Sequence, residues 1–71
     1  MLKKISFFIK DRRKRAGLTQ IELAERAGVG LRFLRELEQG KESVQLNKVN
    51  QVVNFFGYQI GLEEINRGGD E

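Results

Sequence analysis

The stretch that decides the fold runs from Gly17 to Lys41 and reads GLTQIELAERAGVGLRFLRELEQGK. Apolar residues recur in it at helical spacing in two short blocks, which indicates two amphipathic helices. The first block follows Thr19, and Glu22 three residues later completes a capping box, a sequence typical of a helix start. Gly28 stands just after this block, where a helix end usually requires a left-handed residue. We therefore expect two short helices joined by a tight, glycine-bearing turn.

The flanking sequence predicts two further helices. One is capped by Ser6 and ends near Arg15, and the other covers about Leu46 to Phe56. The second helix of the central pair covers about Leu31 to Gln39. Two short helices joined in this way form a helix-turn-helix unit, whose second helix can enter the major groove of DNA. The expected fold class is all-α, with a four-helix DNA-binding domain over residues 1–57.

The pattern changes after the last predicted helix. Tyr58, Ile60 and Leu62 alternate with less apolar residues, which is typical of a strand, so we expect a dimerisation strand over residues 58–64. A lone strand cannot satisfy its own backbone groups, and antiparallel pairing with a second copy solves this. The alternative is a segment that packs on its own domain. Residues 65–71 hold two glycines and are expected to be a disordered tail.

Composition narrows the function classes. The chain has 71 residues with no cysteine and no histidine, which disfavours disulfides, thiolate metal sites and histidine-based catalysis. The acidic residues form no obvious catalytic pair, so we expect neither an enzyme nor a cofactor or metal. No run is long enough to span a membrane and no secretory signal fits, which favours the cytoplasm.

Basic residues are concentrated before Gly17, against Asp11 as the one acidic residue there, although the net charge is only +3. Such a cluster is either an ordinary solvated helix face or a patch that faces phosphates. Its members are Lys3, Lys4, Lys10, Arg12, Arg13, Lys14 and Arg15.

The motif GLTQxELAxxAGVx4LxxLExGK, beginning at Gly17, resembles the phage-repressor (Cro/C1, XRE-type) DNA-binding domain, and the resemblance covers about residues 5–57. The short chain and the segment from Phe55 to Ile60 more narrowly resemble HipB-type antitoxins. Those proteins repress their own operon and bind a HipA-type serine/threonine kinase toxin.

The resemblance implies roles for residues at matching positions. The glutamine at the start of the family's second helix contacts a DNA phosphate, which implies this role for Gln20, with Thr19 beside it. Lys41, Asn47 and Lys48 are further candidates for phosphate contacts, or else ordinary solvated surface. The positions expected to read bases are Gly30, Leu31, Arg32, Arg35 and Glu36.

The chain departs from the family at the first recognition positions, where Gly30-Leu31-Arg32 replaces small polar residues. Leu31 is either a thymine-methyl contact or apolar surface, and Phe33 either packs in the core or contacts the DNA backbone. The family also implies a partly buried ion pair between Arg13 and Glu38, with a structural role.

The function expected from these features is a homodimeric repressor that binds double-stranded DNA at a palindromic operator. The narrower resemblance implies an autoregulating antitoxin with a HipA-like kinase as its partner. Two alternatives stay open, a stand-alone phage or chromosomal repressor and a protein-interaction module that has lost DNA binding.

Overall fold

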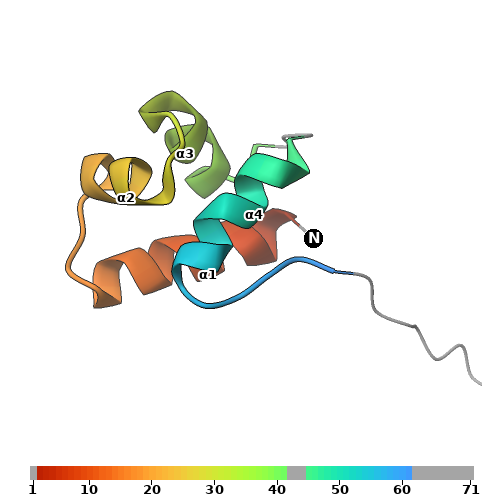
Figure 1. Cartoon of the computed structure of the whole chain (residues 1–71), viewed down its shortest axis with the longest axis horizontal. Helices are drawn as coiled ribbons and strands as arrows, with labels where there is room; N and C mark the ends of the chain where they lie inside the picture. Colours follow the sequence, from red (N-terminus) through yellow and green to blue (C-terminus); the bar gives the residue numbers. More distant parts are fainter. Residues whose placement is uncertain (1, 42–44, 62–71) are drawn as a thin grey trace, which may run out of the picture.

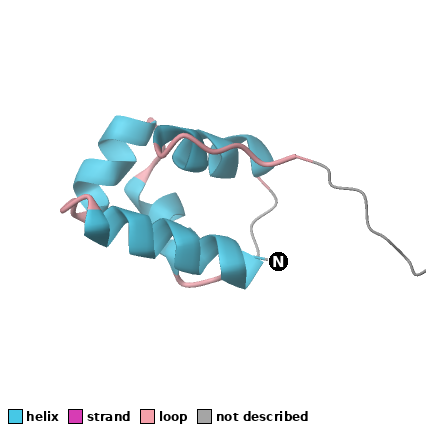
Figure 2. Cartoon of the chain, turned by 90° about the horizontal axis from the view of Figure 1, so that it is seen from below, coloured by secondary structure: helices cyan, strands magenta, loops and turns pink. Residues whose placement is uncertain are grey.

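A computed structural model describes residues 2–41 and 45–61, and these residues form four helices (Figure 1). They are α1 (Leu2–Arg15), α2 (Gln20–Ala27), α3 (Leu31–Glu38) and α4 (Leu46–Phe55). The described residues contain helices and loops but no strand (Figure 2). The all-α class expected from the sequence is confirmed.

The central α2–turn–α3 unit forms as its local sequence predicts. The Thr19 hydroxyl accepts a hydrogen bond from the Glu22 backbone N–H, and the Glu22 carboxylate accepts one from the Thr19 N–H. At the other end of α2, Gly28 has a φ of 78°, and its N–H donates to the Ala24 and Glu25 carbonyls. Both ends of α2 are therefore closed by interactions within a few residues of chain.

The predicted start of α1 is wrong, because the helix begins at Leu2 and not after Ser6. Ser6 is buried in the middle of α1, and its hydroxyl donates to the backbone carbonyl of Leu37 in α3. A serine hydroxyl can cap a helix or make a contact to another element, and the local sequence does not distinguish these uses. Here the packing of α1 against α3 decides between them.

The core lies where the four helices meet, since α2 contacts α3 and α4 while α1 contacts α3. Two large apolar side chains of the helices lie outside the core, because Ile21 and Leu46 are 53% and 56% exposed. Ile21 is two residues from buried Leu23, which turns it by about 200° around the helix. Leu46 is the first residue of α4. The fully buried side chains are Ile9, Leu23, Leu34, Leu37, Val49 and Val52.

The strand expected over 58–64 is absent from residues 58–61, and Leu62 with the rest of the chain lies outside the described residues. The segment instead attaches to its own domain. The Ile60 N–H donates to the Asn50 side chain at 2.9 Å, and the Tyr58 N–H donates to the Val53 carbonyl. These backbone groups have partners on α4, so the single chain does not require a neighbouring strand for them.

None of the helices in the described ranges is long and apolar enough to cross a membrane.

Candidate nucleic-acid interface

Helix α3 presents one polar face to solvent and buries the other. Leu34 and Leu37 are fully buried, whereas the Arg32 side chain is 94% exposed and Arg35 is exposed as well. Arg32 and Arg35 are three residues apart, so they lie on neighbouring positions of the outer face. The helix therefore displays two guanidinium groups on the side away from the core.

The two arginines differ in their side-chain interactions. Arg32 Nε lies 3.7 Å from the Glu36 carboxylate one turn later, and Lys41 Nζ lies 3.9 Å from the same carboxylate. Arg35 has no side-chain hydrogen bond or ion pair with any residue in the described part of the chain. A free guanidinium can donate two hydrogen bonds to guanine O6 and N7. Arg35 is the side chain most available for such a contact.

The helix begins at residues with open surroundings. Gly30 precedes α3 with extended backbone angles, and a Cβ added there would meet no atom within 4 Å. The fold itself therefore does not require glycine at this position, which leaves room for a ligand surface to approach closely. Leu31 is half-buried and packs against the core, as does Phe33, so both contribute to packing.

A polar network fixes the inner edge of α3. Arg13 Nε lies 2.7 Å from Glu38 Oε2, and a second guanidinium nitrogen lies 3.0 Å from Oε1. Gln20 Nε2 also donates to Glu38 Oε1 at 3.0 Å, while Arg13 donates to the Leu18 carbonyl. The Glu38 side chain is only 1% exposed, and these donors compensate the burial of its charge. The network joins α1, α2 and α3.

Gln20 is the site residue whose partner sequence reasoning missed. The resemblance predicts a phosphate contact for Gln20, and the structure shows that its side-chain amide, at the start of α2, donates to Glu38 at the end of α3. The amide nitrogen carries two hydrogens, so the bond to Glu38 occupies one and leaves the other available. Nothing in the local sequence identifies Glu38, eighteen residues away, as the partner.

The other candidates for phosphate contacts lie near the edge of α3 opposite the Arg13–Glu38 pair. Lys41 follows the helix, Asn47 is exposed at the start of α4, and the Lys48 ammonium lies 5.8 Å from the centre of the Phe33 ring. Thr19 differs from them, because its hydroxyl is engaged in the α2 cap. That cap lowers the pKa of Glu22 below its ordinary value of 4.5, chiefly through the hydrogen bond from the Thr19 backbone.

Gln39 is an exposed residue that the sequence assignment omitted. It caps the C-terminal end of α3, where its N–H donates to the Arg35 carbonyl. Its position four residues after Arg35 places it on the same outer face. This spacing is the signal that could have added Gln39 to the candidate base-reading residues.

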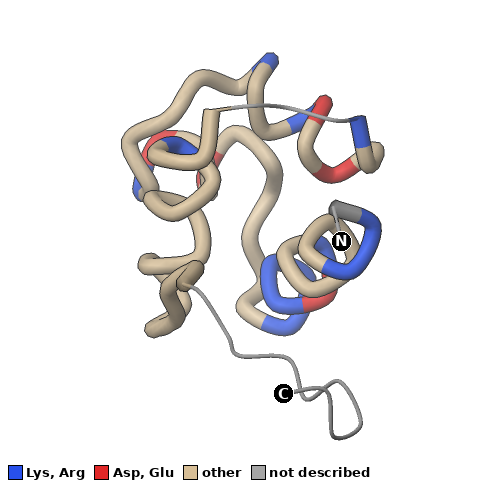
Figure 3. The backbone as a smooth tube through the Cα atoms, turned by 90° about the vertical axis from the view of Figure 1, so that its right-hand side faces the viewer, with Lys and Arg blue, Asp and Glu red and all other residues tan. Residues whose placement is uncertain are grey.

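Charge is distributed unevenly over the helices. Basic positions follow α1 along its length, whereas Lys48 is the one charged residue of α4 (Figure 3). No group of three or more acidic side chains in the described ranges is placed to hold a metal ion. The chemistry that α3 and its surroundings offer is hydrogen bonding and attraction to anions.

Comparison with known proteins agrees with this geometry. The model of the "Helix-turn-helix" family matches residues 9–62. The chain is 45% identical over 58 residues to the "Uncharacterized HTH-type transcriptional regulator y4mF" of Sinorhizobium fredii, covering 82% of this chain and 76% of the relative. It is 41% identical over 49 residues to an "Uncharacterized HTH-type transcriptional regulator" of Methanothermobacter thermautotrophicus, covering 69% of this chain and 71% of the relative. No solved structure matches significantly. The motif, its geometry and these relatives together show that the chain belongs to the helix-turn-helix family.

Proposed function

We propose that the protein is a sequence-specific DNA-binding transcriptional repressor that acts as a homodimer. The observation that carries the proposal is the outer face of α3, where Arg32 and Arg35 are exposed and Arg35 has no partner in the described chain. A short helix with free guanidinium groups on its solvent side suits entry into a major groove. The names of both relatives, which call them transcriptional regulators, support the same function.

In this proposal the base-reading groups are Arg32, Arg35 and Glu36, with Gly30 and Leu31 at the groove floor. The Glu36 carboxylate has two roles open to it, since it can accept from a cytosine amino group or orient Arg32. The phosphate contacts come from both edges of α3. Gln20 and Thr19 lie on one edge, and Lys41, Asn47 and Lys48 lie on the other.

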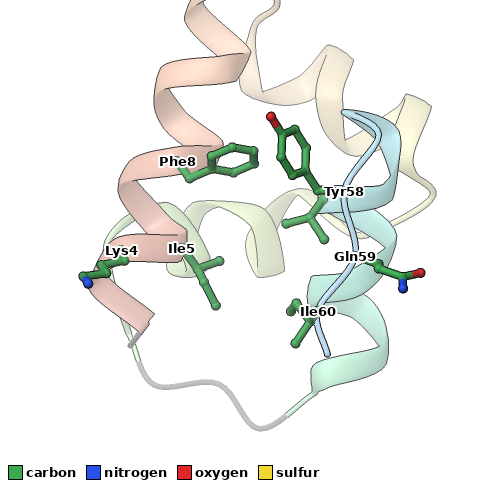
Figure 4. A pocket seen from close by; sticks show the side chains of 7 residues that line it. Lys4, Ile5, Phe8, Tyr58, Gln59 and Ile60 are labelled. Atoms are coloured by element: carbon green, nitrogen blue, oxygen red, sulfur yellow. The ribbon is translucent and has the colours of Figure 1, made fainter. Parts of the chain in front are cut away.

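In the proposed homodimer, the second copy supplies a second recognition helix, and the spacing of the two helices sets the spacing of the operator half-sites. Two recognition helices in successive major grooves would lie about 34–36 Å apart on a near-palindromic site. The proposed contact surface is an apolar hollow of about 380 Å³ between α1, α4 and residues 58–60. Figure 4 shows Phe8 and Tyr58 facing one another there, with Ile5 and Ile60 below them. Tyr58, which lines the hollow, is 47% exposed and contributes an apolar surface that a second copy would cover.

The test of repression is DNA binding measured by fluorescence anisotropy. The protein is titrated with its own upstream DNA and with scrambled DNA at several salt concentrations. We expect a preference for the upstream DNA and an affinity that falls steeply with salt, because phosphate contacts release counterions. Equal and weak binding to both sequences at every salt concentration would contradict autoregulation.

The test of the dimer is sedimentation with Tyr58→Asp, a residue that lines the hollow. A charge at this exposed position should shift the mass towards the monomer, since it would be buried in the contact. Ile21→Asp, at a 53% exposed apolar position of α2, is the control and should leave the mass unchanged. A wild-type protein that sediments as a monomer both alone and with DNA would reject the dimer.

The resemblance to HipB-type antitoxins extends the proposal to a protein partner, a HipA-like kinase. Such a kinase would bind the repressor away from the outer face of α3, so that DNA and toxin are held together. The prediction is that a kinase encoded beside this chain copurifies with it and is inhibited by it. A stand-alone repressor would show the same DNA binding without such a partner.

A further inference from the structure

The basic residues of α1 divide into groups with different partners. Arg12 donates to the Tyr58 hydroxyl at 3.1 Å and lies 5.1 Å from the Phe8 ring centre. Arg13 pairs with Glu38, and Arg15 pairs with Asp11 at 3.0 Å. These arginines hold the fold or their own helix together, and the structure gives them partners inside the protein.

Lys3 and Lys10 are different, because both are exposed and neither forms an ion pair with a described residue. They lie seven residues apart, two turns along one face of α1. Ser6 lies between them and donates to the Leu37 carbonyl, so this is the face that α1 turns towards α3. The two ammonium groups therefore stand beside the recognition helix, not at a remote surface.

A hollow of about 280 Å³ separates these lysines from the end of α3. Lys3, Phe7 and Lys10 line it on the α1 side, and Gln39 and Gly40 line it on the α3 side. Gly40 lies next to α1, since a Cβ added there would be in ordinary van der Waals contact with Ser6 Oγ at 3.8 Å and Lys3 Cγ at 4.0 Å. Because Gln39 also belongs to the outer face of α3, the hollow opens next to the surface proposed to meet DNA.

The charge of the hollow favours an anion. Glu38 also lines it, but its carboxylate is nearly fully buried and engaged by Arg13 and Gln20. The two lysines are therefore left without an acidic partner in the described chain. Their other use would be to neutralise the negative end of the α3 dipole, which requires no ligand. Phe7 is 72% exposed, and the dipole does not account for an apolar ring at the rim.

We propose that this hollow is a phosphate-binding site for the DNA strand that runs along the α1 edge of α3. Lys3 and Lys10 contact successive phosphates and Phe7 packs on the sugar between them. The strip from Lys3 to Arg13 extends for about 15 Å along α1, and Gln20 of α2 lies at its far end, where it shares the Glu38 carboxylate with Arg13. The inference rests on the proposed DNA binding and adds a contact strip on α1 to it. The backbone is then held on both edges of α3, by this strip and by Lys41 and Lys48.

The experiment compares two charge-matched double variants on the protein's own upstream DNA and on a scrambled duplex. Lys3→Gln with Lys10→Gln removes the proposed contacts. Lys14→Gln with Arg15→Gln removes the same charge from the same helix, at two exposed positions that line neither hollow. The slope of log K against log salt should fall by about 3.6 per bound dimer in the first variant, since two contacts are lost in each copy and each contributes roughly 0.9. The control should keep the wild-type slope.

Two outcomes would overturn the inference. Equal loss of slope in both variants would mean that only total charge matters. An unchanged slope with a lower melting temperature in the first variant would mean that the lysines only stabilise the end of α3. The salt slope can be measured on scrambled duplex even if the protein has no sequence preference. A failure of the repressor proposal would therefore appear in a different measurement, as equal affinity of the wild-type protein for both duplexes.

Discussion

Helix α3 carries one arginine–glutamate pair on its inner edge and another on its outer face, and the two pairs have different roles. On the inner edge, Arg13 and Glu38 bind one another in a nearly dry setting, with side chains 12% and 1% exposed. On the outer face, Arg32 and Glu36 lie 3.7 Å apart with side chains 94% and 41% exposed. Burial makes the first pair part of the architecture, whereas hydration leaves the second pair weak and free to exchange partners.

The largest loss of stability is expected on the inner edge of α3. Arg13→Leu should lower the free energy of unfolding by about 3–5 kcal/mol, because it leaves the Glu38 charge buried and unpaired. Urea denaturation followed by circular dichroism measures the loss. Arg13→Leu combined with Glu38→Leu should recover much of the stability, since no buried charge then remains. A double variant less stable than Arg13→Leu alone would show that the network contributes more than charge compensation.

The outer face should respond in binding and not in stability. Arg35→Ala should cost about 1–3 kcal/mol of preference for operator over scrambled DNA, the value of one bidentate contact to guanine. Its effect on unfolding should stay within about 0.5 kcal/mol, as for other exposed positions. Parallel anisotropy titrations and thermal melts measure the two effects. An unchanged preference at full stability would remove Arg35 from the base-reading set.

Arg32→Ala should give a smaller loss of preference than Arg35→Ala, because Arg32 already shares the Glu36 carboxylate with Lys41. The variant should also leave the salt slope of binding to scrambled DNA near the wild-type value, since a base contact releases few counterions. The same titrations over a salt series measure both quantities. A larger loss for Arg32→Ala than for Arg35→Ala would reverse the order inferred from the ion pairs.

The cap of α2 should contribute the smallest effects, and these depend on pH. Thr19→Ala should lower stability by about 1 kcal/mol through loss of the side-chain cap. The lowered pKa of Glu22 means that its ionised form stabilises the fold. That contribution is present above about pH 4.5 and is lost as the pH falls through the lower pKa of the folded state. The melting temperatures of the wild type and Glu22→Gln, measured from neutral to acid pH, should therefore converge below pH 4.5. A difference in melting temperature that stays constant over this range would contradict the linkage.

Sequence reasoning succeeded where structure depends on neighbours in the chain. The capping box of Thr19 and Glu22, the left-handed Gly28 and the apolar spacing around Leu34 all act within a few residues. It failed at Ser6, which the local sequence predicts to be a cap, and at residues 58–61, which the alternating pattern predicts to be part of a strand. In both places the side chain or backbone has a partner far away in the sequence, on α3 or on α4.

The sequence by itself determined the elements of the protein, because caps, glycines and helical periodicity act through local backbone geometry. It also supplied, through a family resemblance, the residues expected to meet DNA. Only the tertiary structure decided which charged groups are already engaged. Arg13, Lys3 and Lys10 share one face of α1, yet Arg13 has Glu38 and the lysines have an open hollow. That distinction depends on how α1 packs against α3, and packing between distant segments sets burial, which governs the strength of every charge interaction.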